Sequence, residues 1–310
     1  MRVFYSERLT IPLPDGHRFP VTKYRMLREA LVRDRVLQAD EICPAPMATR
    51  EQLLWAHGAA YVDSILDGSV DPKILKRIGF PWNEGLVLRS LATVGGAIAS
   101  ALAALEEGVS GNLAGGTHHA HADSGEGYCV FNDQAIVALG LLDGRLAARP
   151  VRRVSIVDLD VHQGNGNSSI LRLRPDVFVL SLHGERNYPF RKVPSSLDVG
   201  LPDQTGDDAY LSALRSALPR AFEFAPDLVL YQAGVDPLAQ DTLGRLALSF
   251  AGLRERDRLV LEACRMAGIP VSLAMGGGYA RPIELTVQAH VNTYRAVKEV
   301  FAGPGAHAHG

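Results

Sequence analysis

The sequence has few cysteines, no strong charge imbalance and no long uninterrupted apolar run, and each of these features excludes a class of protein. Its three cysteines, Cys43, Cys129 and Cys264, are odd in number and widely spaced, so they indicate neither a disulfide framework nor a thiolate zinc cage. With 32 basic and 34 acidic residues the formal charge is −2, and without a basic excess we expect no nucleic-acid binding. The longest uncharged run, Ser90 to Leu105, is rich in glycine and alanine and too short to span a bilayer.

The composition is that of a folded protein from a reducing compartment. No basic stretch followed by an apolar one opens the sequence, so a signal peptide is not indicated and a cytoplasmic location is expected. Hydrophobic residues make up 47% and charged residues 21% of the 310 residues, which predicts a sizeable core. The oligomeric state cannot be inferred from the sequence.

From about Arg152 onward, short β-branched runs alternate with longer segments of helical periodicity. The expected strands are Val154–Val161, Val177–His183, Leu228–Gln232 and Val271–Met275. The expected helices span residues 86–107, 132–142, 207–224 and 252–266. This alternation predicts an α/β fold of three layers, α/β/α, with a mostly parallel sheet. We expect one catalytic domain over residues 1–302 and a flexible tail over residues 303–310.

The strongest local signal is the segment VDLDVHQGNG, residues 157–166. If the strand continues through it, Asp158, Asp160 and His162 point to one side, because side chains on a strand alternate with a period of two. Asp and His two residues apart can bind one divalent metal ion, and parallel sheets bind ligands beyond the carboxyl ends of their strands. The alternative is a strand end that exposes its charges to water, which explains one Asp well but two Asp and a His poorly.

A further Asp follows the strand at 228–232, in the segment AGVDP that contains Asp236. Taken alone, an Asp at a strand exit is equally well explained as a turn residue. Combined with Asp160 and His162 it completes three protein ligands with an open position, which is typical of a catalytic metal site.

Two adjacent histidines, His118 and His119, follow a pair of glycines in the segment GGTHHAH. A lone histidine is more often structural, but this segment also holds acidic residues, and histidine suits a general base at neutral pH. We interpret the third histidine, His121, as structural or exposed.

The segment GGGY, residues 276–279, follows the expected strand at 271–275. Its glycines permit close backbone approach, and the absence of a following Gly-Lys-Ser/Thr excludes a P-loop. The hydroxyl of Tyr279 could donate a hydrogen bond to a developing oxyanion. The alternative is a core tyrosine beside a tight turn.

Taken together, these segments resemble the histone deacetylase family, the zinc amidohydrolases with an arginase-like α/β fold. The resemblance runs in order through GGTHHAHADSGEGYCVFND, VDLDVHQGNG, LSLH, LPDQTGDDAY, YQAGVDPLAQD and AMGGGY. The segments PLPDGHRFPVTKYRML and IGFPWNEGL, with Gln163 and Asn165, are similar to the class IV branch and its bacterial relatives. The resemblance implies a zinc-dependent hydrolase that removes an acetyl or longer acyl group from an amine, with acyl-lysine as the expected substrate.

The resemblance also implies the roles of the catalytic residues. Asp160, His162 and Asp236 would hold zinc, with iron(II) as an alternative in the cell. His118 and His119 would flank the zinc-bound water, and His119 would act first as base and then as acid. Asp158 would orient His118, while Tyr279 would polarise the scissile carbonyl.

Two further sites are implied in the same way. A K⁺ or Na⁺ ion would be bound by Asp158, Asp160, His162, Ser181 and Leu182. The walls of an acyl-lysine tunnel would include Gly127, Tyr128, Tyr188 and Gly277.

Asn165 stands where many relatives carry Asp beside the second histidine. His119 would then face a neutral amide while His118 keeps the carboxylate of Asp158, so we expect His119 to be the more easily neutral member. The alternative is that Asn165 is only a turn residue between two glycines.

Three alternative functions remain open. An acetylpolyamine or another small acetylated metabolite would be an acylated amine too, and fold and family do not determine the substrate. An arginase-like ureohydrolase with two manganese ions would need several bridging Asp, where this sequence has Gln163 and Asn165. A non-catalytic module that binds acyl ligands would not need the full set of implied catalytic residues. In each case we expect no membrane partner.

Overall fold

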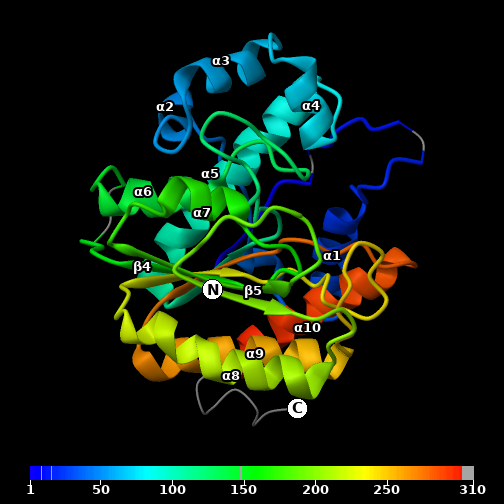
Figure 1. The fold of residues 1–310 in the computed structure, drawn as a ribbon, viewed down its shortest axis with the longest axis vertical. Helices are drawn as coiled ribbons and strands as arrows, with labels where there is room; N and C mark the ends of the chain where they lie inside the picture. Colours follow the sequence, from blue (N-terminus) through cyan, green and yellow to red (C-terminus); the bar gives the residue numbers. More distant parts are fainter. Residues whose placement is uncertain (8, 15, 147–148, 302–310) are drawn as a thin grey trace.

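An eight-stranded parallel sheet runs through the centre of the structure, with helices on both faces (Figure 1). The computed structural model describes residues 1–301 except 8, 15, 147 and 148. In spatial order the strands are β2 (Ile42–Pro44), β1 (Val3–Tyr5), β3 (Val109–Asn112), β8 (Val271–Ala274), β7 (Leu228–Gln232), β4 (Val154–Asp158), β5 (Val177–Gly184) and β6 (Leu197–Leu201). The predicted three-layer α/β/α architecture with a parallel sheet is confirmed.

The helices form two layers, one on each face of the sheet. One layer consists of α8 (Asp207–Glu223), α9 (Phe250–Ala267), α10 (Ile283–Phe301) and α1 (Lys23–Arg33). The other consists of α5 (Glu84–Glu107), α6 (Asp133–Leu142) and α7 (Asn165–Leu171). The short helices α2 (Arg50–Leu53), α3 (Ala59–Asp67) and α4 (Pro72–Ile78) lie farther out on the side of α5, as Figure 1 shows.

The central strands β4 and β7 are buried along their whole length and mostly apolar, because both faces of the sheet are covered. On β4, Ile156 joins the core beneath α5 and α6, while its neighbour Val157 joins the core beneath α8 and α9. On β7, Leu230 and Tyr231 divide between the two cores in the same way. This alternation is the two-residue period of a strand, expressed here between two buried layers.

The boundaries of the predicted helices agree with the structure within two residues, but one predicted strand is too long. The strand expected at 154–161 ends at Asp158. The carboxylate of Asp158 accepts a hydrogen bond from the backbone N–H of Asp160 (3.2 Å). In the same way, the carboxylate of Asp160 accepts one from the backbone N–H of His162 (3.0 Å). Since side chains take these donors, the strand gives way to a loop at this point. The tail predicted at 303–310 lies outside the described residues.

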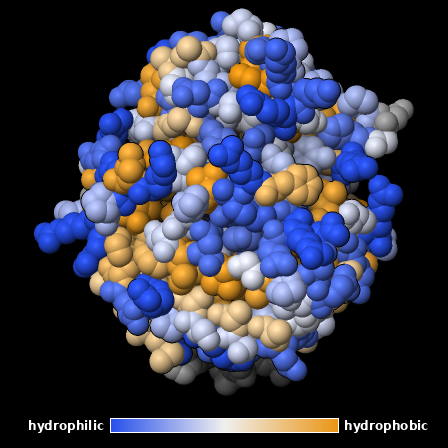
Figure 2. Space-filling view, in the orientation of Figure 1, coloured by the Kyte–Doolittle hydropathy of each residue, from blue (hydrophilic) through white to orange (hydrophobic). Residues whose placement is uncertain are grey.

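Helix α5 is long and apolar enough to cross a membrane by composition, yet 72% of its most apolar window is buried inside the structure. Its glycines allow close packing: a Cβ added at Gly95 would lie 2.0 Å from the carbonyl oxygen of Pro46. Helix α5 is therefore a core helix, buried in the layer that covers one face of the sheet. On the outside, Figure 2 shows hydrophilic residues interrupted by separate apolar patches, as on most globular surfaces.

Candidate active site

The carboxyl ends of four neighbouring strands, β3, β8, β7 and β4, meet at one edge of the sheet. The loops that follow them carry His118 and His119, Tyr279, Asp236, and the pair Asp160 and His162, respectively. Most of these side chains, taken from widely separated segments, line a single cavity of about 580 Å³. This is the position at which open parallel sheets bind their ligands.

Asp160, His162 and Asp236 form a compact set of metal-ligating side chains. Their candidate ligand atoms all lie within 4.8 Å of one another. The Nδ1 atom of His162 is 3.0 Å from Asp160 Oδ1 and 3.1 Å from Asp236 Oδ2. Within residues 1–301, apart from the four positions left undescribed, this is the one such group of three or more. Two carboxylates and an imidazole can together bind one divalent metal ion.

The two buried carboxylates of this group favour a nearby positive charge. Burial, together with the charge of Asp160, raises the pKa of Asp236 to about 7. Burial lowers the pKa of His162, but hydrogen bonds and charges from Asp160 and Asp236 outweigh it and raise that pKa to about 10. A protonated imidazole thus offsets the charge of one of the two buried carboxylates. A divalent ion fits here because it would supply that positive charge while the imidazole gives up its proton to become a ligand.

Glycines allow the backbone to come close to the two carboxylates. A Cβ added at Gly277 would lie 1.8 Å from Asp236 Oδ2, and one at Gly234 would lie 2.2 Å from Asp160 Oδ2. The N–H of Gly277 donates to Asp160 Oδ2 (2.7 Å), and the N–H of Val161 donates to Asp236 Oδ1 (2.9 Å). Gly277 lines the cavity, as expected of a substrate-binding residue, but its N–H contacts a candidate metal ligand.

A buried arginine on α9 supports the two loops that carry Asp160 and Asp236. Arg256 on α9 donates to the carbonyl oxygens of Leu159 (3.2 Å) and Gly234 (2.5 Å), which lie one residue before Asp160 and two residues before Asp236. Its guanidinium also pairs with the buried carboxylate of Asp257 at 2.7 Å. Arg256 was not predicted as a site residue, because an arginine in an amphipathic helix is usually exposed.

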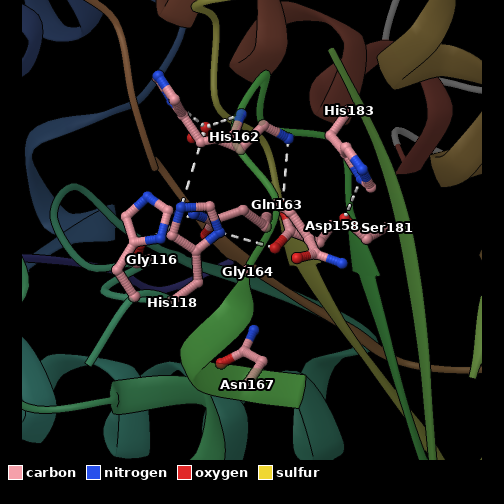
Figure 3. Close-up of polar contacts among 12 residues, drawn as sticks. Gly116, His118, Asp158, His162, Gln163, Gly164, Asn167, Ser181 and His183 are labelled. Carbon is pink, nitrogen blue, oxygen red and sulfur yellow. Dashed lines mark hydrogen bonds and ion pairs between the residues drawn. The ribbon is translucent and has the colours of Figure 1, made fainter. Parts of the chain in front are cut away.

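The two adjacent histidines are both buried, with ring centroids 4.2 Å apart. His118 Nδ1 is 2.7 Å from Asp158 Oδ2, and Figure 3 shows the imidazole of His118 facing that carboxylate. His119 Nδ1 is 2.7 Å from Asn165 Oδ1, so the expected contact between His119 and the amide is present. Asn165 lies at the start of α7 and is more than a turn residue.

The pKa values of the two histidines move in opposite directions. Burial lowers both, but the charges of Asp158 and Asp160 outweigh it for His118 and raise its pKa to about 9. Burial and the neighbouring imidazoles of His118 and His162 hold the pKa of His119 well below its usual value. The pair therefore combines one charged and one neutral imidazole near neutral pH, which an acid–base mechanism requires. Burial and neighbouring rings account for the difference more than the amide does.

Two carboxylates hold the site loops through backbone N–H groups, and the sequence analysis assigned neither of them a role. Asp133 accepts hydrogen bonds from the N–H groups of Gly116 (2.8 Å) and Thr117 (2.9 Å), next to His118. Asp241 accepts one from the N–H of Tyr279 (2.6 Å). The position of Asp133 in the first turn of α6 was a usable signal, because acidic residues there face free N–H groups.

The predicted tunnel residues lie on the same cavity as Tyr279. The ring of Tyr128 is 6.1 Å from that of Tyr279 and packs among aromatic neighbours, 5.2 Å from Phe19. The ring of Tyr188 lies 5.0 Å from the imidazole of His119 in an edge-to-face arrangement. Gly127, which has a positive φ of 55°, places its own backbone against His119.

Of the residues predicted to bind a monovalent cation, Asp158, Ser181 and Leu182 lie on the neighbouring strands β4 and β5, and Asp160 and His162 lie in the loop after β4. Asp158 on β4 is the register partner of Ser181 on β5. The hydroxyl of Ser181 is 2.9 Å from His183 Nδ1, a contact drawn in Figure 3, and Leu182 is fully buried. The binding of K⁺ or Na⁺ stays a prediction.

Comparison with known proteins places these features in a family. The histone deacetylase domain matches residues 17–294. Histone deacetylase 2 of Arabidopsis thaliana is 32% identical over 277 residues, which cover 86% of this chain and 70% of that protein. An uncharacterized protein of Picosynechococcus sp. is 43% identical over 300 residues, covering 96% of this chain and 99% of its own length. The structure of an HDAC homologue from Aquifex aeolicus superposes with a TM-score of 0.78 at 23% identity, covering 97% of this chain and 88% of that one.

Proposed function

The chain belongs to the histone deacetylase family, and from this membership we propose that it is a zinc-dependent, class IV-like deacetylase that removes an acetyl or longer acyl group from acyl-lysine. One observation carries the proposal: a candidate metal site, a buried histidine pair and Tyr279 converge at one cavity edge. A cytoplasmic location and a K⁺ or Na⁺ ion near Asp158 and Ser181 are parts of the same proposal.

Asp160, His162 and Asp236 would hold the metal ion, which would lower the pKa of a water molecule and polarise the amide carbonyl. His119, kept neutral by its surroundings, removes a proton from the attacking water. Tyr279 donates its hydroxyl proton in a hydrogen bond to the developing oxyanion. His118 carries a positive charge that stabilises the same oxyanion, and one of the two imidazoles then protonates the leaving amine.

The lining of the cavity favours acyl-lysine over an acetylpolyamine. Aromatic walls such as Tyr128 and Tyr188 suit the aliphatic stem of a lysine. The cavity is also lined by Lys76, Arg77, Arg186 and Arg245, all exposed, whereas the one carboxylate in its lining is the candidate metal ligand Asp160. An acetylpolyamine keeps protonated amines that these cations would repel.

Steady-state kinetics with defined metal content test the proposal. The purified protein is stripped with a chelator, reloaded with zinc or iron(II), and assayed for acetate release from acetyl-lysine peptides with acidic or basic flanks and from an acetylated polyamine. We expect activity only after reloading, with the highest kcat/KM for the acidic peptide. Faster turnover of the polyamine would reverse the substrate assignment, release of urea from a guanidino compound would indicate a ureohydrolase, and binding without turnover would indicate a ligand-binding module.

A further inference from the structure

Behind Asn165 lies a carboxylate that the roles proposed so far do not use. Glu126 lies in the loop between His119 and α6, with a side chain 17% exposed. Its Oε1 atom is 2.6 Å from Asn165 Nδ2, while Asn165 Oδ1 is 2.7 Å from His119 Nδ1. We propose that Glu126 is a positioning residue: it fixes the direction of the Asn165 amide and thereby the tautomer of His119. The catalytic consequence rests on the proposed function.

The tautomer follows from donor and acceptor chemistry. An ionised carboxylate only accepts hydrogen bonds, so the N–H of the Asn165 amide must face Glu126 and its oxygen must face His119. The amide oxygen also only accepts, and therefore His119 Nδ1 must carry the hydrogen. The Nε2 atom of His119 is then left with a free lone pair, as a general base requires.

Other groups around Glu126 keep it ionised. His121 Nε2 is 3.5 Å from Glu126 Oε1, and Tyr188 is a further neighbour of this carboxylate. Burial raises the pKa of Glu126, but hydrogen bonds from His121, Asn165 and Tyr188 outweigh it and lower the pKa to about 2. Glu126 therefore connects the support of His119 to the tunnel wall at Tyr188. His121, interpreted from the sequence as structural or exposed, belongs to this network, and its Nδ1 is 2.6 Å from Ser169 Oγ.

The two histidines are therefore supported in different ways. Asp158 faces His118 directly, whereas the carboxylate of Glu126 acts on His119 through an intervening amide. The amide transmits the direction of the hydrogen bond without placing a full charge against His119. The arrangement also predicts that Asn165→Asp alone would put two carboxylates in contact.

A charge swap tests the proposal. In Glu126→Gln the new amide can donate or accept, so the direction of Asn165 is no longer determined, and we expect kcat to fall by about tenfold or more with little change in KM. Asn165→Asp should lose at least as much through repulsion. In the double variant Glu126→Gln/Asn165→Asp, the amide at 126 donates to the carboxylate at 165, which faces His119 as an acceptor again. We expect the double variant to be more active than either single variant, which is a positive coupling in the double-mutant cycle.

Asp123→Asn is the matched control, because it removes one carboxylate from an exposed position of the same loop. It should retain parental kcat, and all variants should retain metal content and thermal stability. A parental kcat in Glu126→Gln, or a double variant no more active than the better single variant, would overturn the proposal.

A second readout does not depend on hydrolysis. Nitrogen-15 NMR of histidine-labelled protein reports which imidazole nitrogen carries the hydrogen. We expect the Nδ1–H tautomer for His119 in the parent and a mixture of tautomers in Glu126→Gln; an Nε2–H tautomer in the parent would refute the inference. A parent that shows the Nδ1–H tautomer but hydrolyses no acyl-lysine would refute the proposed function and leave the positioning role of Glu126 intact.

Discussion

Two regions of the cavity are built in different ways: the metal cradle, formed by Asp160, His162 and Asp236, and the tunnel, formed by Tyr128 and Tyr188. In the cradle every side chain is buried, and backbone N–H groups such as that of Gly277 hold the carboxylates. The tunnel side chains are only partly buried, and the cations beside them are exposed. Both regions belong to loops at the same edge of the sheet.

The difference separates the part of the site that would carry out the reaction, which is rigidly held, from the part that would contact the substrate, where side chains have more room. In the cradle the glycines beside the carboxylates cannot gain a Cβ without moving the chain, so the backbone and the carboxylates it holds leave little room for change. An aromatic or basic side chain at the tunnel can change while the backbone stays in place. We therefore expect substitutions in the cradle to remove the reaction and substitutions at the tunnel to alter its substrate.

The largest effect is expected from the cradle itself. Asp160→Ala or Asp236→Ala should abolish both metal retention and hydrolysis, because each removes one of three protein ligands. Elemental analysis of the purified protein together with turnover measures both effects. Asp208→Ala, which removes an exposed carboxylate on α8, is the control. Full metal occupancy in either cradle variant would remove that residue from the ligand set.

The second-largest effect is expected at Arg256, which supports the loops of the cradle. Arg256→Met leaves the buried carboxylate of Asp257 without its cation and frees the carbonyls of Leu159 and Gly234, so we expect about 3–5 kcal/mol lower free energy of unfolding. Arg254→Met on the same helix breaks only a surface pair with Glu299 and should cost about 1 kcal/mol or less. Denaturant unfolding of the metal-free proteins provides the comparison, and equal losses would show that Arg256 does not support the cradle.

Tyr279 lies between the two regions and should give an intermediate effect. Tyr279→Phe removes one oxyanion donor and should lower kcat on the order of 100-fold. Metal content and thermal stability should remain parental, since the hydroxyl serves no cradle residue. A nearly parental rate would return Tyr279 to the alternative of a structural tyrosine beside a glycine turn.

The smallest effect is expected at the basic rim. Replacing Lys76 and Arg77 together by Glu should raise kcat/KM for an acetylated polyamine relative to an acidic acetyl-lysine peptide by a few-fold, because each exposed pair contributes about 0.2–1 kcal/mol. The change should weaken at high ionic strength. Lys73→Glu, on the same helix but outside the cavity lining, is the control. An unchanged ratio would remove the rim charges from substrate selection.

Much of the fold and the position of the site could be predicted because their signals are local. The apolar strands at 177–183 and 228–232 and the helices between them have clear periodicities, and parallel strands bring their carboxyl ends to one edge. The placement of Asp158, Asp160 and His162 on one continuous strand was wrong. The carboxylates of Asp158 and Asp160 take the N–H groups that a strand would need, and a two-residue period does not reveal this competition.

By itself, the sequence determined the parallel sheet and the chemistry of each loop, since periodicity and residue type act over a few neighbours. Only the tertiary structure decided which distant groups meet. Arg256 reaches the carbonyl of Leu159 from a position 97 residues away, and Glu126 meets Asn165 across 39 residues. The direction of the Asn165 amide follows from that second contact, because an amide offers a donor on one side and an acceptor on the other. The orientation of the amide therefore depends on residues that only the tertiary fold brings next to it, and the neighbours of Asn165 in the sequence do not determine it.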